Sequence, residues 1–312
     1  EIGACDWSSD VCSSDLTAPE PPGGRWRWVG TGKTIRHERA VMAVTLPESM
    51  LAQYRRFTLF NSPYAEHDDG RAVDLYPESE RAPSPVAGTV EAIKRVRAPP
   101  RDYAAEEDAM LVIDTGESLA RILHVDPVVE EGETVEPGDD LGSLIRAGFF
   151  APWVPNHLHL GFREYGTDPF RASGSLPLEV GVEVRPLAWD GTGTVVETGE
   201  TWARLDSPAH PGPGEYFVGL ESDGGVLDGG LPHYAFGGLL GGGERAEVTG
   251  ESVGTVEDGV VAWDGVTVLA NGEAITGLAL FCARGSFGIK LVGEDVDFDV
   301  GESVSVSVES FD

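Results

Sequence analysis

The alternation of apolar and polar positions after residue 42 is that of short β-strands separated by turns. Runs rich in Val, Ile, Leu and Thr are bounded by Gly, Pro or Asp, which end strands and turn the chain. A single short helix is expected near residues 48–56, and the acidic segment 98–109 is interpreted as a surface loop between two strands. The pattern predicts an all-β fold. The clearest strand runs are PVAGTVEAIKRV (85–96), AMLVIDTG (109–116), LARILHV (119–125) and HLHLGF (157–162).

Length and turn residues together predict two domains. The 312 residues are enough for two domains, each with its own core. Pro and Gly residues within 168–178 indicate a linker. We therefore predict an antiparallel β-sheet domain over residues 42–172. A second β-rich domain, a sandwich or a barrel, is predicted over residues 173–312.

The first 41 residues differ in character from the rest. Residues 1–16, EIGACDWSSDVCSSDL, resemble a translated sequencing adapter. Residues 17–41 contain five basic side chains and the Pro-rich run APEPPGG. We expect residues 1–41 to be an artefact or a disordered leader that contributes nothing to the fold, with Met42 as the candidate start.

The charge of the chain restricts its partners. Asp and Glu number 53 against 22 Lys and Arg, which gives a net charge of −31. We expect neither nucleic acid nor a membrane as a partner, because few cations are present to neutralise phosphate groups. The acid excess runs along the whole body and only three Lys occur, which favours adaptation to high salt, where ions screen self-repulsion. A surface that simply keeps the protein in solution is the alternative. No signal sequence or membrane-spanning segment is recognised, so a cytoplasmic location is expected.

Residues 129–142 follow the regular pattern VxxGxxVxxGxxLG, which predicts a hairpin with its apolar side chains facing inward. Lipoyl-type carrier domains contain such a hairpin, but they need a modifiable Lys at its tip. The only Lys in this region is Lys94, in KRVRAPP, and it lacks the Met or acidic neighbours that are usual for such a Lys. We therefore set the carrier-domain interpretation aside.

A pair of histidines near residue 158 favours a metal site. On a strand, residues two apart point to the same face, so His157 and His159 share one face while Leu158 and Leu160 point to the core. Two imidazoles on one face can serve one metal ion, or one ion and its water. A pair of exposed strand histidines is the alternative interpretation.

Two further groups are candidates for the same site. Asp74 lies at the start of a predicted strand between two apolar residues, and His67 precedes it in a polar loop. His124 interrupts the apolar run 119–125. The structural alternatives are an acidic surface turn for the first group and an ordinary core histidine for the second.

Taken in order, these pieces resemble the M23 (lysostaphin/LytM-type) zinc metallopeptidases over residues of about 60–165. That family shows an early His and Asp, an AP-x-x-GTV segment, a strand His, the VxxGxxVxxGxxLG pattern and HLHF. The matching parts here are His67 with Asp74, residues 82–90, His124, residues 129–142 and His157–Leu160.

The resemblance implies a function and a role for each residue. His67, Asp74 and His159 would bind Zn²⁺, while His124 and His157 would flank it. One of these two histidines would act as general base, and the other would stabilise the oxyanion and protonate the leaving amine. The implied activity is zinc-dependent hydrolysis of a peptide bond, in a peptide or a peptide-containing polymer.

The first motif departs from the family pattern. The family spacing is HxxxD, whereas six residues separate His67 from Asp74, and the position four before Asp74 is Gly70. Either His67 reaches the metal from a longer loop, or Asp68 or Asp69 substitutes for it, or the site is degenerate. A non-catalytic M23-like binding or scaffold module is therefore the main alternative to an enzyme. A metal-dependent hydrolase of another substrate is a third possibility.

Overall fold

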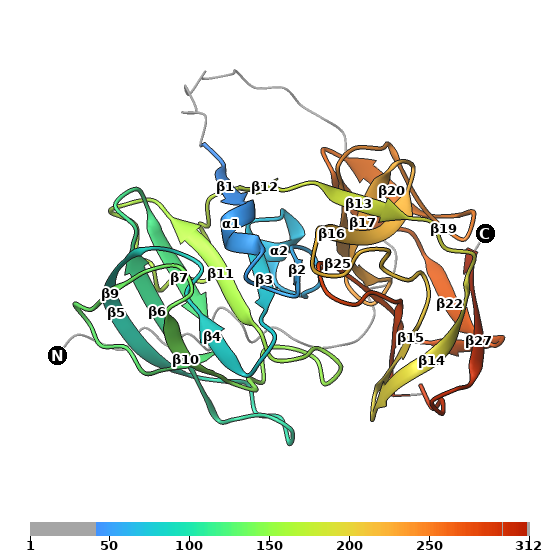
Figure 1. Cartoon of the computed structure of the whole chain (residues 1–312), viewed down its shortest axis with the longest axis horizontal. Helices are drawn as coiled ribbons and strands as arrows, with labels where there is room; N and C mark the ends of the chain where they lie inside the picture. Colours follow the sequence, from blue (N-terminus) through green and yellow to red (C-terminus); the bar gives the residue numbers. More distant parts are fainter. Residues whose placement is uncertain (1–41, 295, 311–312) are drawn as a thin grey trace, which may run out of the picture. The chain divides into compact units, whose positions relative to one another are not determined.

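The computed structural model describes residues 42–294 and 296–310, and almost all of the regular secondary structure in these residues is β-strand (Figure 1). Within these ranges the helices are two single turns, α1 (Glu48–Leu51) and α2 (Ala65–Asp68). The prediction of an all-β fold is confirmed. The expected leader over residues 1–41 lies outside the described residues. In the part of the chain that is described, no helix has the length and apolar character needed to cross a bilayer.

The N-terminal region is built on a mostly antiparallel sheet. Its ladder runs β5–β6–β7–β11–β3–β2, with neighbours antiparallel throughout. The central strands are rich in Leu, Ile and Val and are buried on both faces, because other strands and loops cover them. The strands of this region are β1 (Val44–Pro47), β2 (Arg56–Thr58), β3 (Ala72–Tyr76), β4 (Arg81–Pro83), β5 (Gly88–Arg97), β6 (Glu107–Asp114), β7 (Leu119–Leu123), β8 (Val125–Pro127), β9 (Thr134–Val135), β10 (Asp140–Leu144) and β11 (Leu158–Arg163).

The C-terminal region is also β-rich and surrounds a second apolar core, which includes Leu205, Val261, Leu278, Leu291 and Val306. Its pairings are antiparallel except between β13 and β16, and its first strand, β12, pairs in parallel with β1. The strands are β12 (Leu178–Gly181), β13 (Val184–Leu187), β14 (Thr192–Gly199), β15 (Trp202–Leu205), β16 (Phe217–Ser222), β17 (Gly225–Leu231), β18 (Phe236–Leu240), β19 (Arg245–Val248), β20 (Glu251–Glu257), β21 (Val260–Trp263), β22 (Val266–Ala270), β23 (Glu273–Ile275), β24 (Gly277–Leu280), β25 (Cys282–Ala283), β26 (Lys290–Val292) and β27 (Ser303–Ser310).

The two regions share a sheet and part of a core. Strand β2 pairs with β3 on one side and with β25 on the other, so the sheet continues from one region into the next (Figure 1). Phe217, Val226 and Cys282 of the second region join the core of the first. The described residues from Met42 onward accordingly form one compact unit.

The segment 129–142 differs from the predicted hairpin. Its apolar residues Val129, Val135 and Leu141 are buried as expected, and Gly132 and Gly138 turn the chain with positive φ. Its two strands do not pair with each other, however. β9 pairs with β5, whereas β10 pairs with β4 and β8. The glycines therefore let the segment cross between two sheets instead of folding back on itself.

A buried carboxyl group fastens β2 to β17. Asp228 is 0% exposed, its Oδ1 accepts a hydrogen bond from the Thr58 hydroxyl, and its Oδ2 accepts one from the Leu59 N–H at 2.6 Å. Burial raises the pKa of Asp228 to about 7, against the opposing effect of these hydrogen bonds. The folded protein therefore holds this proton at a pH where the unfolded chain, with an Asp pKa of about 3.9, has lost it.

Because folded Asp228 retains its proton, we expect the stability difference between the wild type and Asp228→Asn to depend on pH. Between pH 4 and 7 the folded state binds more protons at this group, so its contribution to stability falls as pH rises, by roughly 4 kcal/mol in all. The unfolding free energy of the variant minus that of the wild type should rise by this amount from pH 4 to pH 8 in urea titrations. The exposed control Asp102→Asn should show no such rise. A difference that stays flat for Asp228→Asn would contradict the assignment.

Candidate metal and catalytic site

The long spacing between His67 and Asp74 is taken up by one helical turn. His67 lies in α2, and Gly70, with φ of +62°, turns the chain directly into β3. The N–H of Gly70 bonds to the carbonyl of His67 at 3.2 Å and closes the turn. His67 therefore reaches the site from a compact loop. The two aspartates weighed as substitutes, Asp68 and Asp69, are outside the potential ligand group, and Asp69 pairs with Arg71 at the surface.

Strand register brings His159 beside Asp74. The two residues are directly opposite each other where β11 pairs with β3, so their side chains lie on the same face of the sheet. His157 precedes β11 and places its imidazole on the same side, with Nε2 3.4 Å from Asp74 Oδ2. The expected burial of Val73 and Leu75, on either side of Asp74, is observed.

Three donor atoms converge at one point. His67 Nε2 is 3.1 Å from His159 Nδ1, His159 Nδ1 is 3.1 Å from Asp74 Oδ1, and His67 Nε2 is 3.5 Å from Asp74 Oδ1. Around a tetrahedral zinc ion with bonds of about 2.0–2.1 Å, neighbouring donors lie about 3.3 Å apart. The separations match this spacing, and the group could hold a metal ion.

The protonation of these side chains suits a cation. His67 Nδ1 donates to the Leu59 carbonyl at 2.6 Å, so in the neutral ring the lone pair is on Nε2, which faces the other donor atoms. Burial lowers the pKa of His159 to about 3, so its imidazole is neutral near pH 7. Burial disfavours the charged form of Asp74, but the surrounding imidazoles, His157 and His67 first, outweigh it and hold the Asp74 pKa below its usual range. The neutral imidazole of His159, Nε2 of His67 and the carboxylate of Asp74 are therefore placed to act as ligands.

His124 is held by a buried aspartate. It lies between β7 and β8 with φ of +69°, and its Nδ1 donates to Asp108 Oδ2 at 2.6 Å. Its backbone N–H donates to Asp108 Oδ1 at 3.1 Å. Asp108 is 0% exposed and fixes the tautomer that leaves Nε2 of His124 as the acceptor. Asp108 is not among the residues predicted for the site, because it falls in the segment 98–109 that is predicted to be a surface loop, whereas β6 already begins at Glu107.

His157 completes the group. Its Nδ1 donates to the Pro155 carbonyl at 2.8 Å, so its Nε2 is also left as an acceptor. Burial lowers the pKa of His157 to about 4. Its ring centroid lies 5.1 Å from that of His124 and 4.6 Å from that of Phe150, which packs against both histidines. All five predicted site residues thus lie together, whereas His210 and His233 lie outside the group, as expected.

The comparisons with known proteins divide the chain into two parts. Residues 45–180 match the N-terminal domain of DUF8155, a domain of unknown function, and residues 185–309 match the C-terminal domain of DUF8155. The chain belongs to the DUF8155 family. The family description assigns no activity, and no curated protein matches the sequence.

Two solved structures resemble this DUF8155 protein. A structure of LytU matches with 21% identity and a TM-score of 0.19, covering 32% of this chain and 64% of LytU. The NMR solution structure of lysostaphin matches with 13% identity and a TM-score of 0.26, covering 76% of this chain and 90% of the other. The chain thus spans just under two thirds of LytU. Structural similarity at TM-scores this low supports no inference about activity.

Proposed function

We propose that this protein is a zinc-dependent hydrolase of peptide bonds, of the M23 type. The observation that carries the proposal is the convergence of His67 Nε2, His159 Nδ1 and Asp74 Oδ1 within 3.5 Å of one another. These three residues would hold Zn²⁺. When bound, the metal supplies Lewis-acid activation of water and of a carbonyl group. The substrate class is a peptide or a peptide-containing polymer.

The two remaining histidines would move protons. His124 and His157 each have Nδ1 committed to a buried acceptor, so in the neutral form of each ring Nε2 is the atom that can accept a proton. One can accept a proton from the attacking water, and the resulting imidazolium can donate it to the leaving amine. The other can support charge that develops on the carbonyl oxygen once it is protonated. Asp108 would stabilise a positive charge on His124.

One observation favours the alternative of a non-catalytic binding module. The site is well covered, since the side chains of His67, His124 and His157 are at most 7% exposed and that of His159 is 13% exposed. A substrate must therefore reach the site on the His159 side or displace Phe150. A module that holds a ligand without cleaving it would tolerate such cover more easily.

The full chain, assayed in molar KCl because its net charge of −31 suggests salt adaptation, tests the proposal. We expect about one equivalent of bound zinc and release of new amino groups from pentaglycine. Removal of zinc with a chelator should abolish hydrolysis, and zinc but not magnesium should restore it. Bound zinc without hydrolysis of pentaglycine or a mixed peptide pool would favour the binding module. Absence of zinc binding would overturn the hydrolase and leave a binding module with a degenerate metal site.

A further inference from the structure

Residues 150–155, the site loop, lie between β10 and β11 and are held mainly by side chains. Each of the six backbone carbonyl groups of the site loop accepts a hydrogen bond from a side chain. Pro152 and Pro155 have no N–H group, so regular backbone pairing is not open to them. The conformation of the site loop therefore depends on its four side-chain donors, which are Tyr103, Arg146, His157 and Lys290.

Two of the donors belong to the N-terminal region. The hydroxyl of Tyr103 donates to the Phe150 carbonyl at 3.0 Å. The guanidinium of Arg146 donates to three carbonyl groups and so closes the chain around itself. These acceptors are the carbonyls of Ala151, at 3.0 Å, of Pro152, at 2.8 Å, and of Val154.

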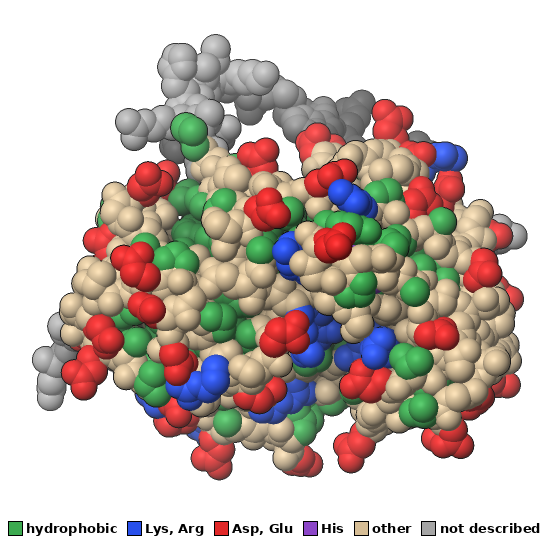
Figure 2. Space-filling view, in the orientation of Figure 1, with side chains coloured by type: hydrophobic (Ala, Val, Ile, Leu, Met, Phe, Trp, Pro, Cys, Tyr) green, Lys and Arg blue, Asp and Glu red, His purple; other side chains and the backbone are tan. Residues whose placement is uncertain are grey.

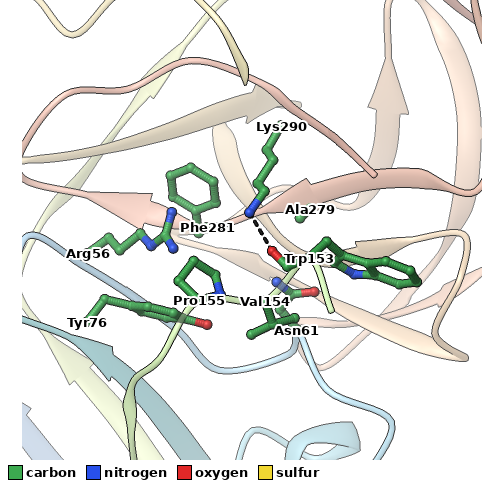
Figure 3. Close-up of a pocket in the computed structure, with 9 residues that line it drawn as sticks. All are labelled: Arg56, Asn61, Tyr76, Trp153, Val154, Pro155, Ala279, Phe281 and Lys290. Atoms are coloured by element: carbon green, nitrogen blue, oxygen red, sulfur yellow. Dashed lines mark hydrogen bonds between the residues drawn. The ribbon is translucent and has the colours of Figure 1, made fainter. Parts of the chain in front are cut away.

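The C-terminal region holds the middle of the site loop through Lys290. This residue of β26 is 4% exposed, and its amine donates to the Trp153 carbonyl (Figure 3). Burial lowers the pKa of Lys290 well below its usual value. The hydrogen bond does not depend on that charge, because the neutral amine also has N–H groups to donate. The Trp153 ring also packs edge-on against His233 of the C-terminal region, with the ring centroids 5.6 Å apart.

The contact between the site loop and the C-terminal region is closely packed. The cavity between them measures about 10 Å³, which is the space of about one water molecule (Figure 3). Closely packed interiors transmit displacements, because they have little free volume to absorb them. A change at Lys290 should therefore move the site loop. The lining includes Trp153, Val154 and Pro155 of the site loop and Ala279, Phe281 and Lys290 of the C-terminal region.

Both ends of the site loop contact the histidines that are proposed to move protons. At one end, the ring centroid of Phe150 lies 4.6 Å from that of His157 and 5.2 Å from that of His124. At the other end, the Pro155 carbonyl accepts the hydrogen bond of His157 Nδ1 at 2.8 Å. This bond sets which ring nitrogen of His157 carries the proton and where Nε2 points.

We propose that Lys290 is a positioning residue for the reaction, and that the C-terminal region is a structural part of the active site. The inference rests on the proposed function. Lys290 holds the Trp153 carbonyl, the site loop carries Pro155, and Pro155 orients His157. Lys290 acts through the site loop and not by contact with the metal or the substrate.

Substitution of Lys290 by Met tests this role, because Met keeps the apolar stem and removes the donor. The zinc-loaded full chain is assayed on pentaglycine in molar KCl, since Asp and Glu are spread over the face that Figure 2 shows. We expect kcat to fall by about 10-fold to 100-fold, the range that a small displacement of a catalytic group can cause. KM and zinc content should be unchanged. If Lys290→Met does not fold, Lys290→Gln, whose amide is too short to reach Trp153, replaces it in the same comparison.

Two further variants separate the site loop from general effects on the fold. Tyr103→Phe removes one hydroxyl from a side chain that is 40% exposed, and it should lower kcat in the same way but by less. Arg204→Met is the matched control. Arg204 lies directly opposite Lys290 where β15 pairs with β26, but its guanidinium pairs with Glu197. Its removal should leave kcat unchanged.

The tautomer of His157 provides a readout that needs no activity. In proton–nitrogen correlation spectra of protein with isotope-labelled histidine, the wild type should show His157 protonated at Nδ1. Lys290→Met should show a mixture of the two tautomers at His157, while His124, held by Asp108, stays protonated at Nδ1.

The spectra also distinguish failure of this inference from failure of the proposed function. An unchanged His157 tautomer in Lys290→Met, or an unchanged kcat, would overturn the positioning role and leave the hydrolase standing. If the wild type cleaves no peptide, the hydrolase fails. A change at His157 without one at His124 would then still support the structural link from Lys290, and no change at His157 would overturn it.

Discussion

Asp74→Asn is expected to weaken zinc binding by more than about 100-fold. Loss of a residue that only orients a ligand already costs about 10–100-fold in metal affinity, and Asp74 would be a ligand itself. The substitution keeps the size of the side chain but removes its charge, which the imidazoles of His67, His157 and His159 surround. Because Asp74 is 3% exposed, no solvent-exposed carboxylate can take its place without rearrangement.

Asp69→Asn is the matched control for this prediction. Asp69 is close in sequence and pairs with Arg71, but its side chain is 66% exposed and is not one of the converging donors. Zinc content after dialysis, and affinity by competition with a chromophoric chelator, should be unchanged in Asp69→Asn and greatly reduced in Asp74→Asn. If Asp74→Asn kept wild-type zinc affinity while Asp69→Asn lost it, Asp69 and not Asp74 would be the carboxylate ligand.

Strand periodicity alone predicts part of the site. The i, i+2 relation places His157 and His159 on one side and buries Leu158 and Leu160, and the structure has this arrangement. Val73 and Leu75, on either side of Asp74, are buried in the same way. These features depend only on the neighbouring residues, so they can be inferred from a single sequence.

Other parts of the site depend on contacts between distant segments. The pairing of His159 with Asp74 follows from the register of β11 on β3, which no local pattern specifies. The turn at Gly70 that compensates for the long His67–Asp74 spacing depends on a positive φ. Asp108 lies in an acidic stretch that is typical of a surface loop. Its position directly before the apolar run AMLVI is the local signal that it belongs to a strand. The hairpin predicted at 129–142 failed for the same reason, since its strands pair elsewhere.

His157→Ala is expected to lower kcat for peptide hydrolysis by about 10²–10⁴-fold while zinc stays bound, the range typical of general acid–base groups. His157 lies next to the ligand group, with Nε2 3.4 Å from Asp74 Oδ2, but it is not one of the three converging donors. Burial lowers the pKa of His157 to about 4, so its Nε2 is unprotonated at neutral pH and can accept a proton from water. Its removal should therefore affect the reaction more than the metal.

His210→Ala is the matched control, because His210 is also buried and hydrogen-bonded but lies in the C-terminal region outside the group. Thermal unfolding of both variants shows whether loss of a buried imidazole alone disturbs the fold. Zinc content, kcat and KM then separate the roles. Loss of zinc from His157→Ala would make His157 a ligand. Full activity with zinc retained would remove it from proton transfer and leave His124, held by Asp108, as the remaining general base.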